Sequence, residues 1–237
     1  MDSRFTDVAA AELIKLRTLP AVAAAVGATL LGVPGLALVL QAAAPKPPGD
    51  AAASAATDAG IQAIEYGQVG LILLGVLAAA TEYSGRQIHT TLKSVPDRPL
   101  LAAGKTVAHL MTAAVTAVLA VAALASVSER ETSIGPLLGA VAYLLLISVL
   151  AYAVALLTRD VLAALVIMLG LVYVASPLLT RVTTAARYLP DRAGTQMYQP
   201  ASSYDATLTA VQGGVLMATW VALTLALATV MFIRRDA

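Results

Sequence analysis

The stretch "IGPLLGAVAYLLLISVLAYAVALL", residues 134–157, has no charged side chain along its whole length. About 20 consecutive apolar residues in a helix are enough to cross the hydrocarbon core of a bilayer. The stretch is therefore predicted to form a membrane-spanning helix. Further runs of the same kind bring the predicted spans to six, at 20–40, 61–80, 107–126, 134–157, 161–179 and 210–233.

The composition of the whole chain agrees with this. Hydrophobic residues make up 59% of it and charged residues only 12%, with a mean hydropathy of +0.82, whereas a soluble domain has roughly 25% charged residues. So few charges cannot cover a water-soluble protein, so we expect an all-α integral membrane protein. A net charge of +1 argues against nucleic acid as a partner, and the absence of cysteine excludes disulfides and thiol catalysis.

The chain is predicted to form a single transmembrane domain, 1–237, with an N-terminal helix before the first span. The first apolar run, at 20–40, is longer than the roughly 7–15 residues of a signal-peptide core, so we interpret it as a retained span. Before it, Phe5, Leu13 and Leu16 share one helical face, into which Glu12 also falls. We therefore expect an amphipathic interfacial helix at 1–19, a six-helix domain at 20–233 and a cytoplasmic tail at 234–237.

Basic residues indicate the orientation. Six spans put both termini on one side, and placing them in the cytoplasm leaves basic residues inside by about two to one. The first external loop, 41–60, is rich in Pro, Ala and Gly and is predicted to be a flexible link. The last, 180–209, contains several tyrosines and prolines and is predicted to form short interfacial helices, with a gate as the alternative.

The segment "TEYSGRQIHTTLKSVPDRPLLAAGKT", residues 81–106, ends like a phosphate-binding loop. Such a loop needs a preceding strand and a glycine at the position that Pro99 occupies, and proline has no amide hydrogen to donate. No nucleotide site is therefore expected in this chain. Lys105 is interpreted as an interfacial lysine whose ammonium group reaches the lipid headgroups.

The same segment has the pattern of a short amphipathic helix. Ile88, Leu92 and Val95 follow one another at i, i+4 and i+7, and Glu82 stands four residues before Arg86, the favourable order for an ion pair. Such a helix either caps the bundle or fits a groove on a soluble partner.

Two motifs resemble the permease subunits of ABC-2 type exporters, in the version common in actinobacteria. They are "AELIKLRTLP" at 11–20 and "EYSGRQIHTTLKSVPDRPLLAAGK" at 82–105. One departure is that glycine comes one position early, at Gly85, so that Arg86 stands in its place. The resemblance implies a transport subunit with no enzymatic activity of its own, which moves a drug-, peptide- or lipid-like substrate out across the bacterial plasma membrane.

The resemblance also implies partners and contact residues. The partners are two copies of an ATP-binding subunit, which hold ATP and Mg²⁺, and a second permease chain, identical or paralogous. The segment between the second and third spans would be the coupling helix that docks on that subunit, and the helix before the first span would be a connecting element. The implied contact residues are Glu82, Tyr83, Arg86, Ile88, Thr91, Leu92, Pro96 and Arg98 in the coupling segment, and Glu12, Lys15 and Arg17 in the connecting helix.

A few polar side chains inside the predicted spans are candidates for a substrate path or gate. They are Glu65, His109, Tyr143, Tyr152 and Tyr173. Intramembrane ionisable groups point to function, but an interfacial Glu65 and an interhelical hydrogen bond from His109 are the simpler interpretations. The two histidines lack a metal-ligand spacing, so neither a metal nor a cofactor is expected in this chain.

Two other functions stay open. A proton-coupled secondary transporter would need internal repeats and ionisable groups near the midplane, for which His109 is the one candidate. A membrane scaffold that recruits an ATPase without moving a substrate would share the coupling segment.

Overall fold

The computed structural model describes residues 2–43, 50–84, 97–128, 133–199 and 208–234, and all the regular elements in these ranges are helices. In chain order they are α1 (Asp2–Thr18), α2 (Pro20–Ala43), α3 (Asp50–Ser84), α5 (Arg98–Val127), α6 (Ile134–Thr158), α7 (Val161–Gly170), the π-helical turn η1 (Leu171–Ala175), α8 (Ser176–Val182), the 3₁₀ helix η2 (Thr184–Tyr188), α9 (Pro190–Thr195) and α10 (Ala210–Arg234).

Six helices of this part of the chain are long and apolar enough to cross a membrane. They are Pro20–Ala43, Asp58–Ala80, Arg98–Val127, Ile134–Thr158, Val161–Val182 and Ala210–Arg234. The predicted spans are thus confirmed as apolar helices of sufficient length. α1 is also a helix, and it ends just before Pro20, which starts α2 because a first-turn residue needs no amide hydrogen.

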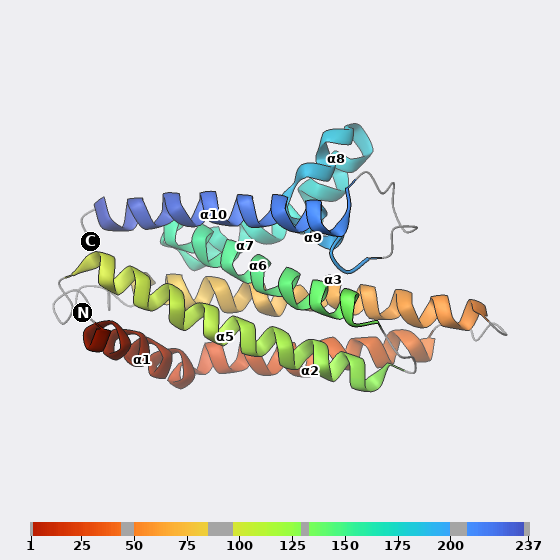
Figure 1. Cartoon of the computed structure of the whole chain (residues 1–237), viewed down its shortest axis with the longest axis horizontal. Helices are drawn as coiled ribbons and strands as arrows, with labels where there is room; N and C mark the ends of the chain where they lie inside the picture. Colours follow the sequence, from red (N-terminus) through yellow and green to blue (C-terminus); the bar gives the residue numbers. More distant parts are fainter. Residues whose placement is uncertain (1, 44–49, 85–96, 129–132, 200–207, 235–237) are drawn as a thin grey trace.

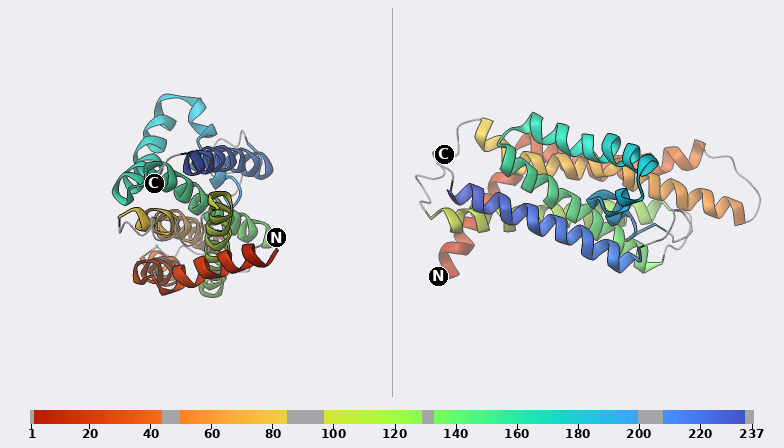
Figure 2. Two further views of the ribbon diagram at one scale, coloured as in Figure 1. Left: turned by 90° about the vertical axis from the view of Figure 1, so that its left-hand side faces the viewer. Right: turned by 90° about the horizontal axis from the view of Figure 1, so that it is seen from above.

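The long helices form a bundle along the longest axis of the molecule (Figure 1). The start of α1, the first turn of α5 and the last turn of α10 lie at one end of it, which we call the α1 end. α1 itself turns away from the bundle axis (Figure 2). η2 and α9 lie toward the opposite end, beside the first turns of α10, and we call this the α9 end.

α3 and α6 are the central helices of the bundle. In the most apolar part of α3, 61% of the residues are buried, and in that of α6, 67% are buried. The corresponding share is 22% in the fifth span and in α10. The outer helices instead expose apolar side chains such as Leu31, Val115 and Leu223. Apolar side chains on the outside of an apolar helix bundle are what a bilayer solvates.

The two central helices touch backbone to backbone at Gly75. A Cβ added there would meet the carbonyl oxygen of Ser148 and would lie 3.0 Å from the amide nitrogen of Tyr152. Only glycine allows this approach, which is how small residues bring helices together in lipid.

The fifth span contains a π-helical turn. The amide of Ser176 donates to the carbonyl of Leu171, five residues earlier, and Pro177 follows in the first turn of α8. Proline has no amide hydrogen for a regular α-helical bond and disturbs the turn before it. Tyr173 lies at the centre of this π turn.

One expectation about the loops is wrong. Residues 41–60 are not one flexible link, because α3 begins at Asp50. Alanine, which makes up most of residues 50–60, has the highest helix propensity of all residues and outweighs Gly60. In the other loop the predicted short helices are found, as η2 and α9.

Candidate functional site

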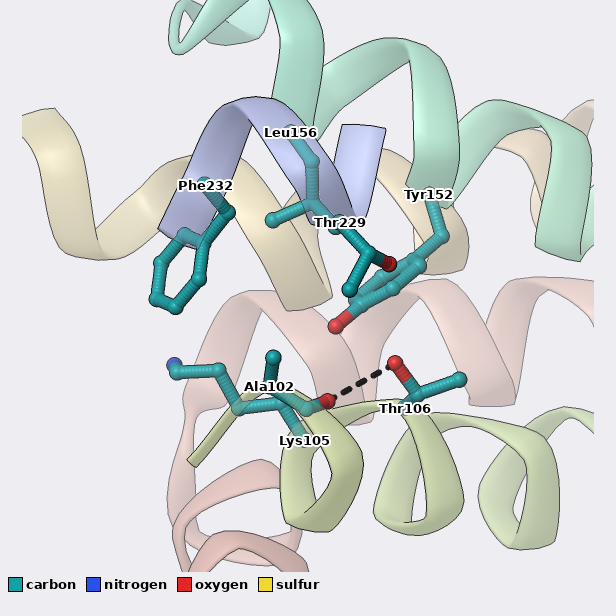
Figure 3. Close-up of a pocket in the computed structure, with 7 residues that line it drawn as sticks. All are labelled: Ala102, Lys105, Thr106, Tyr152, Leu156, Thr229 and Phe232. Carbon is teal, nitrogen blue, oxygen red and sulfur yellow. Dashed lines mark hydrogen bonds between the residues drawn. The ribbon is translucent and has the colours of Figure 1, made fainter. Parts of the chain in front are cut away.

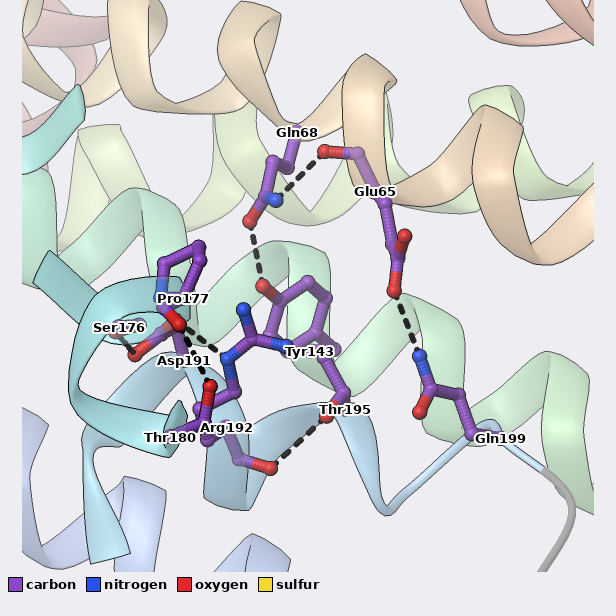
Figure 4. Close-up of polar contacts among 10 residues, drawn as sticks. All are labelled: Glu65, Gln68, Tyr143, Ser176, Pro177, Thr180, Asp191, Arg192, Thr195 and Gln199. Atoms are coloured by element: carbon purple, nitrogen blue, oxygen red, sulfur yellow. Dashed lines mark hydrogen bonds and ion pairs between the residues drawn. The ribbon is translucent and has the colours of Figure 1, made fainter. Parts of the chain in front are cut away.

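The first candidate site is a cavity of about 200 Å³ between α3, α6, η1, α8 and α9, which we call the polar cavity. Figure 4 shows the polar contacts among several of its residues, three of which come from α9. Its lining residues are Glu65, Tyr66, Gln68, Tyr143, Val172, Tyr173, Pro177, Asp191, Arg192 and Thr195.

Three side chains of the polar cavity are fixed by hydrogen bonds to α3. The Tyr143 hydroxyl donates to Gln68 Oε1 over 2.5 Å, and Gln68 Nε2 donates to the Glu65 carbonyl over 2.6 Å. The Tyr173 hydroxyl donates to the same carbonyl over 2.7 Å. Since Tyr143 is completely buried, its hydroxyl needs this partner.

The two carboxylates of the polar cavity have different partners. Glu65 Oε1 accepts a hydrogen bond from Gln199 Nε2 at 2.8 Å. Asp191 Oδ1 accepts one from the Ser176 hydroxyl at 2.7 Å, and Arg192 Nε lies 3.7 Å from Asp191 Oδ2. Burial raises the pKa of the Asp191 carboxyl, while the Ser176 hydrogen bond and the Arg192 charge act in the opposite direction.

The second candidate site lies at the α1 end, where α1 packs on the first turns of α5; we call it the α1–α5 junction. Lys105 Nζ lies 3.4 Å from Glu12 Oε2, and Lys15 Nζ lies 3.8 Å from Glu12 Oε1. Next to this contact, a Cβ on Gly104 would lie 2.7 Å from Val8 Cγ1. The closeness of α1 to α5 therefore depends on a glycine as well as on a charge pair.

The prediction that Lys105 reaches the headgroups is wrong. Its side chain is only 6% exposed, because α1 covers the face of α5 on which it lies. Glu12 falls on the apolar face of α1 for the same reason: it is the counter-charge of Lys105. Burial lowers the pKa of Lys15, and the nearby charge of Lys105 lowers it further, against the opposing effect of Glu12. Arg17, the third predicted residue of the connecting helix, is exposed.

The start of α5 is anchored at the same end. Asp97 caps the helix, its Oδ1 accepting from the Leu100 amide at 3.1 Å. Arg98 donates from Nη1 to the Ile233 carbonyl at 3.3 Å and so joins α5 to the last turn of α10. Figure 3 shows the crevice behind this junction, lined by Ala102, Lys105, Thr106, Tyr152, Leu156, Thr229 and Phe232; it has no room for a water molecule.

His109 lies between the two candidate sites. Its ring is completely buried and stacks on Tyr152, with the ring centroids 4.6 Å apart and the planes 8° from parallel. Its Nε2 lies 3.4 Å from Ser148 Oγ, and its Nδ1 has no hydrogen-bond partner in the described part of the chain. These contacts join His109 on α5 to two residues of α6, which fits the expected role of an interhelical contact.

The five predicted path residues therefore form two groups. Glu65, Tyr143 and Tyr173 meet at the polar cavity, whereas His109 and Tyr152 stack on each other outside it. In the coupling segment, Glu82 and Tyr83 belong to the last turn of α3 and Arg98 begins α5. The other predicted contacts, Arg86, Ile88, Thr91, Leu92 and Pro96, lie outside the described residues.

Sequence reasoning missed part of the polar cavity. Gln68 comes three residues after Glu65, and that spacing alone places both on one face of α3. Asp191 and Arg192 lie in the loop between two spans, and their approach to α3 depends on how η2 and α9 fold back, which no local pattern reveals. Within the described ranges, no three His, Asp or Glu side chains are placed to hold a metal ion.

No protein-family model matches the sequence, and no curated protein matches it either. A function for this chain therefore has to be inferred from the two candidate sites and the two motifs.

Proposed function

We propose that this chain is the membrane-spanning permease subunit of an ATP-driven exporter of the ABC-2 type. The observation that supports this most is the buried pair of Glu12 and Lys105. Each belongs to one of the two motifs that resemble this family, and the motifs are far apart in the sequence. Their direct contact is what a shared docking surface for one partner requires.

The ends of the helices support the same proposal. α3 ends at Ser84 and α5 begins at Arg98, and both points lie at the α1 end (Figure 1). The coupling segment therefore starts and finishes at the same end of the bundle as α1. A soluble ATP-binding subunit that docks there would contact both the coupling segment and the connecting helix.

The mechanism we propose is mechanical. ATP and Mg²⁺ bind in two copies of the partner subunit, whose closure displaces the coupling segment. α1 follows α5 because the α1–α5 junction is a buried ion pair, and α6 follows α3 because the two backbones touch at Gly75. The bundle then changes from inward-open to outward-open as packed helices shift as units.

The orientation and the second chain belong to the same proposal. The α1 end faces the cytoplasm of a bacterium, in agreement with the excess of basic residues on that side. A second permease chain packs against this one in the plasma membrane, and a drug-, peptide- or lipid-like substrate crosses between or within the two bundles.

Crosslinking tests the proposed docking surface, because the chain has no cysteine of its own. A benzophenone maleimide attached at Ile88→Cys should crosslink in native membranes to a protein that carries an ATP-binding site. Ser126→Cys is the matched control, an exposed position in the last turns of α5 at the other end of the bundle. Equal crosslinking from both positions, or from neither, would contradict the proposal.

A further inference from the structure

The two tyrosine hydroxyls of the polar cavity offer a ligand acceptors and not donors. The hydroxyl hydrogens of Tyr143 and Tyr173 are used in bonds to Gln68 and to the Glu65 carbonyl. What these two tyrosines present to the cavity is therefore ring surface and oxygen lone pairs. Acceptors and ring surface suit a ligand that donates hydrogen bonds or bears a positive charge.

The charges of the cavity point in the same direction. It is lined by two carboxylates, Glu65 and Asp191, and one guanidinium, Arg192. Arg192 Nε lies 3.7 Å from Asp191 Oδ2 and its charge also acts on Glu65, so one guanidinium is shared by two carboxylates. Among the described residues, Glu65 has no ion pair, and only its Oε1 accepts a side-chain hydrogen bond, so Oε2 has a free acceptor site.

Aromatic rings supply the remaining recognition chemistry. Tyr66 and Tyr173 line the cavity with their centroids 6.5 Å apart and their planes 5° from parallel. The faces of such rings attract cations, most strongly where water is excluded. Tyr173 belongs to the π turn, and π turns inside α-helices are frequent at functional sites.

The size of the cavity limits the ligand. About 200 Å³ corresponds to roughly six or seven water molecules at the density of the liquid. This is room for an alkylated ammonium or a guanidinium group with a short stem, and too little for a whole drug-sized molecule. A larger ligand would place only its charged group here.

We propose that the polar cavity binds the ammonium or guanidinium group of an organic cation, with Glu65 as the counter-charge and Tyr66 and Tyr173 as the aromatic wall. This deepens the function proposed above and rests on it in one respect: if the chain is an exporter, its substrate class is cationic amphiphiles. The binding site itself requires no ATP-binding partner.

The test measures the binding of choline to the full chain in nanodiscs, with saturation-transfer NMR as the readout. Its uncharged isostere 3,3-dimethylbutan-1-ol serves as the comparison, since the two differ in charge and hardly in shape. We expect choline to bind at least about tenfold more tightly than the isostere, and Glu65→Gln to abolish that preference. Asp58→Asn, an exposed carboxylate on the same helix, should leave the preference intact.

A second pair of variants keeps the test valid if Glu65→Gln does not fold. Tyr66 is 57% exposed, so its replacement should not disturb the bundle. Tyr66→Leu should weaken choline binding several-fold, and Tyr66→Phe, which keeps the ring, should not. The proposal is overturned if the isostere binds as well as choline, or if Glu65→Gln or Tyr66→Leu retains the wild-type preference.

These outcomes are separate from those of the crosslinking experiment. A choline preference without an ATP-binding partner would keep the cation site and refute the exporter. A partner without a choline preference would keep the exporter and refute the cationic substrate class.

Discussion

Lys105 Nζ lies 3.4 Å from Glu12 Oε2, and this ion pair joins helices whose paired residues are 93 positions apart in the sequence. The two side chains are 6% and 11% exposed. Charges buried to this degree are costly unless they are paired, so each residue depends on the other. The energetics of this contact decide whether α1 can move independently of α5.

We predict that losing one member of the pair costs more than losing both. Glu12→Gln should lower the free energy of unfolding by about 3 kcal/mol, because it removes the carboxylate that faces a lysine side chain only 6% exposed. Lys105→Met should cost less, because Glu12 keeps its contact with Lys15 at 3.8 Å. The double variant Glu12→Met with Lys105→Met should be closer to wild type. Unfolding by urea in micelles measures all three, and the exposed Arg17→Met is the control, with a change within about 0.5 kcal/mol. A double variant less stable than both single ones would refute the mutual dependence of the two charges.

Packing of the central helices gives a second prediction. Gly75→Ala should destabilise the chain by about 1–3 kcal/mol, because its Cβ meets the backbone of α6, which cannot move aside. Gly32→Ala, in α2, has nothing within 4 Å of its Cβ and should gain up to about 1 kcal/mol of helix propensity. The midpoint temperature of thermal unfolding should therefore fall in the Gly75 variant and rise in the Gly32 variant. Shifts in the same direction would be incompatible with a backbone contact at Gly75.

The third prediction separates the exporter from a proton-coupled transporter. His109→Phe keeps a ring to stack on Tyr152 and loses only the weak contact with Ser148. We expect a stability change below about 1.5 kcal/mol and an unchanged pH profile of transport. His109→Ala should instead cost about 3 kcal/mol, through the void it leaves. Loss of pH-dependent transport in the Phe variant, with no requirement for ATP, would favour the proton-coupled alternative.

The fourth prediction concerns pH and Asp191. Because burial raises the pKa of its carboxyl, the folded chain keeps a proton that the unfolded chain loses near its ordinary pKa of about 4. The contribution of Asp191 to the free energy of unfolding should therefore fall as the pH rises from about 4 through the raised pKa. Asp191→Asn should remove this part of the pH dependence of the free energy of unfolding. Asp58→Asn, at an exposed carboxylate, should leave it unchanged. The measurement is the free energy of unfolding across this pH range. If it depends on pH equally steeply in the wild type and in both variants, the burial argument is wrong.

The sequence predicts the spans well because their cause is local. Length and hydropathy suffice for a helix such as Ile134–Thr158, whatever it packs against. The start of α3 at Asp50 is harder to predict, because the Pro and Gly content of the stretch indicates a loop, while alanine propensity extends the helix beyond the apolar run.

The sites are harder to predict because their causes are distant in the sequence. Lys105 looks like an interfacial lysine until α1 is known to cover it, and Glu12 looks like a flaw in an apolar face until Lys105 is known to meet it. Asp191 likewise reaches the polar cavity only through the fold of a loop. Periodicity places a residue on a face, but it does not identify the opposing helix.

The most direct test of the proposed exporter is purification of the tagged full chain from its native membrane, followed by an ATP hydrolysis assay with Mg²⁺. We predict that an ATP-binding subunit co-elutes with the chain and hydrolyses ATP, and that the double variant Glu82→Ala with Arg86→Ala loses it. A chain that purifies without an ATPase, or a double variant that retains one fully, would contradict the exporter function.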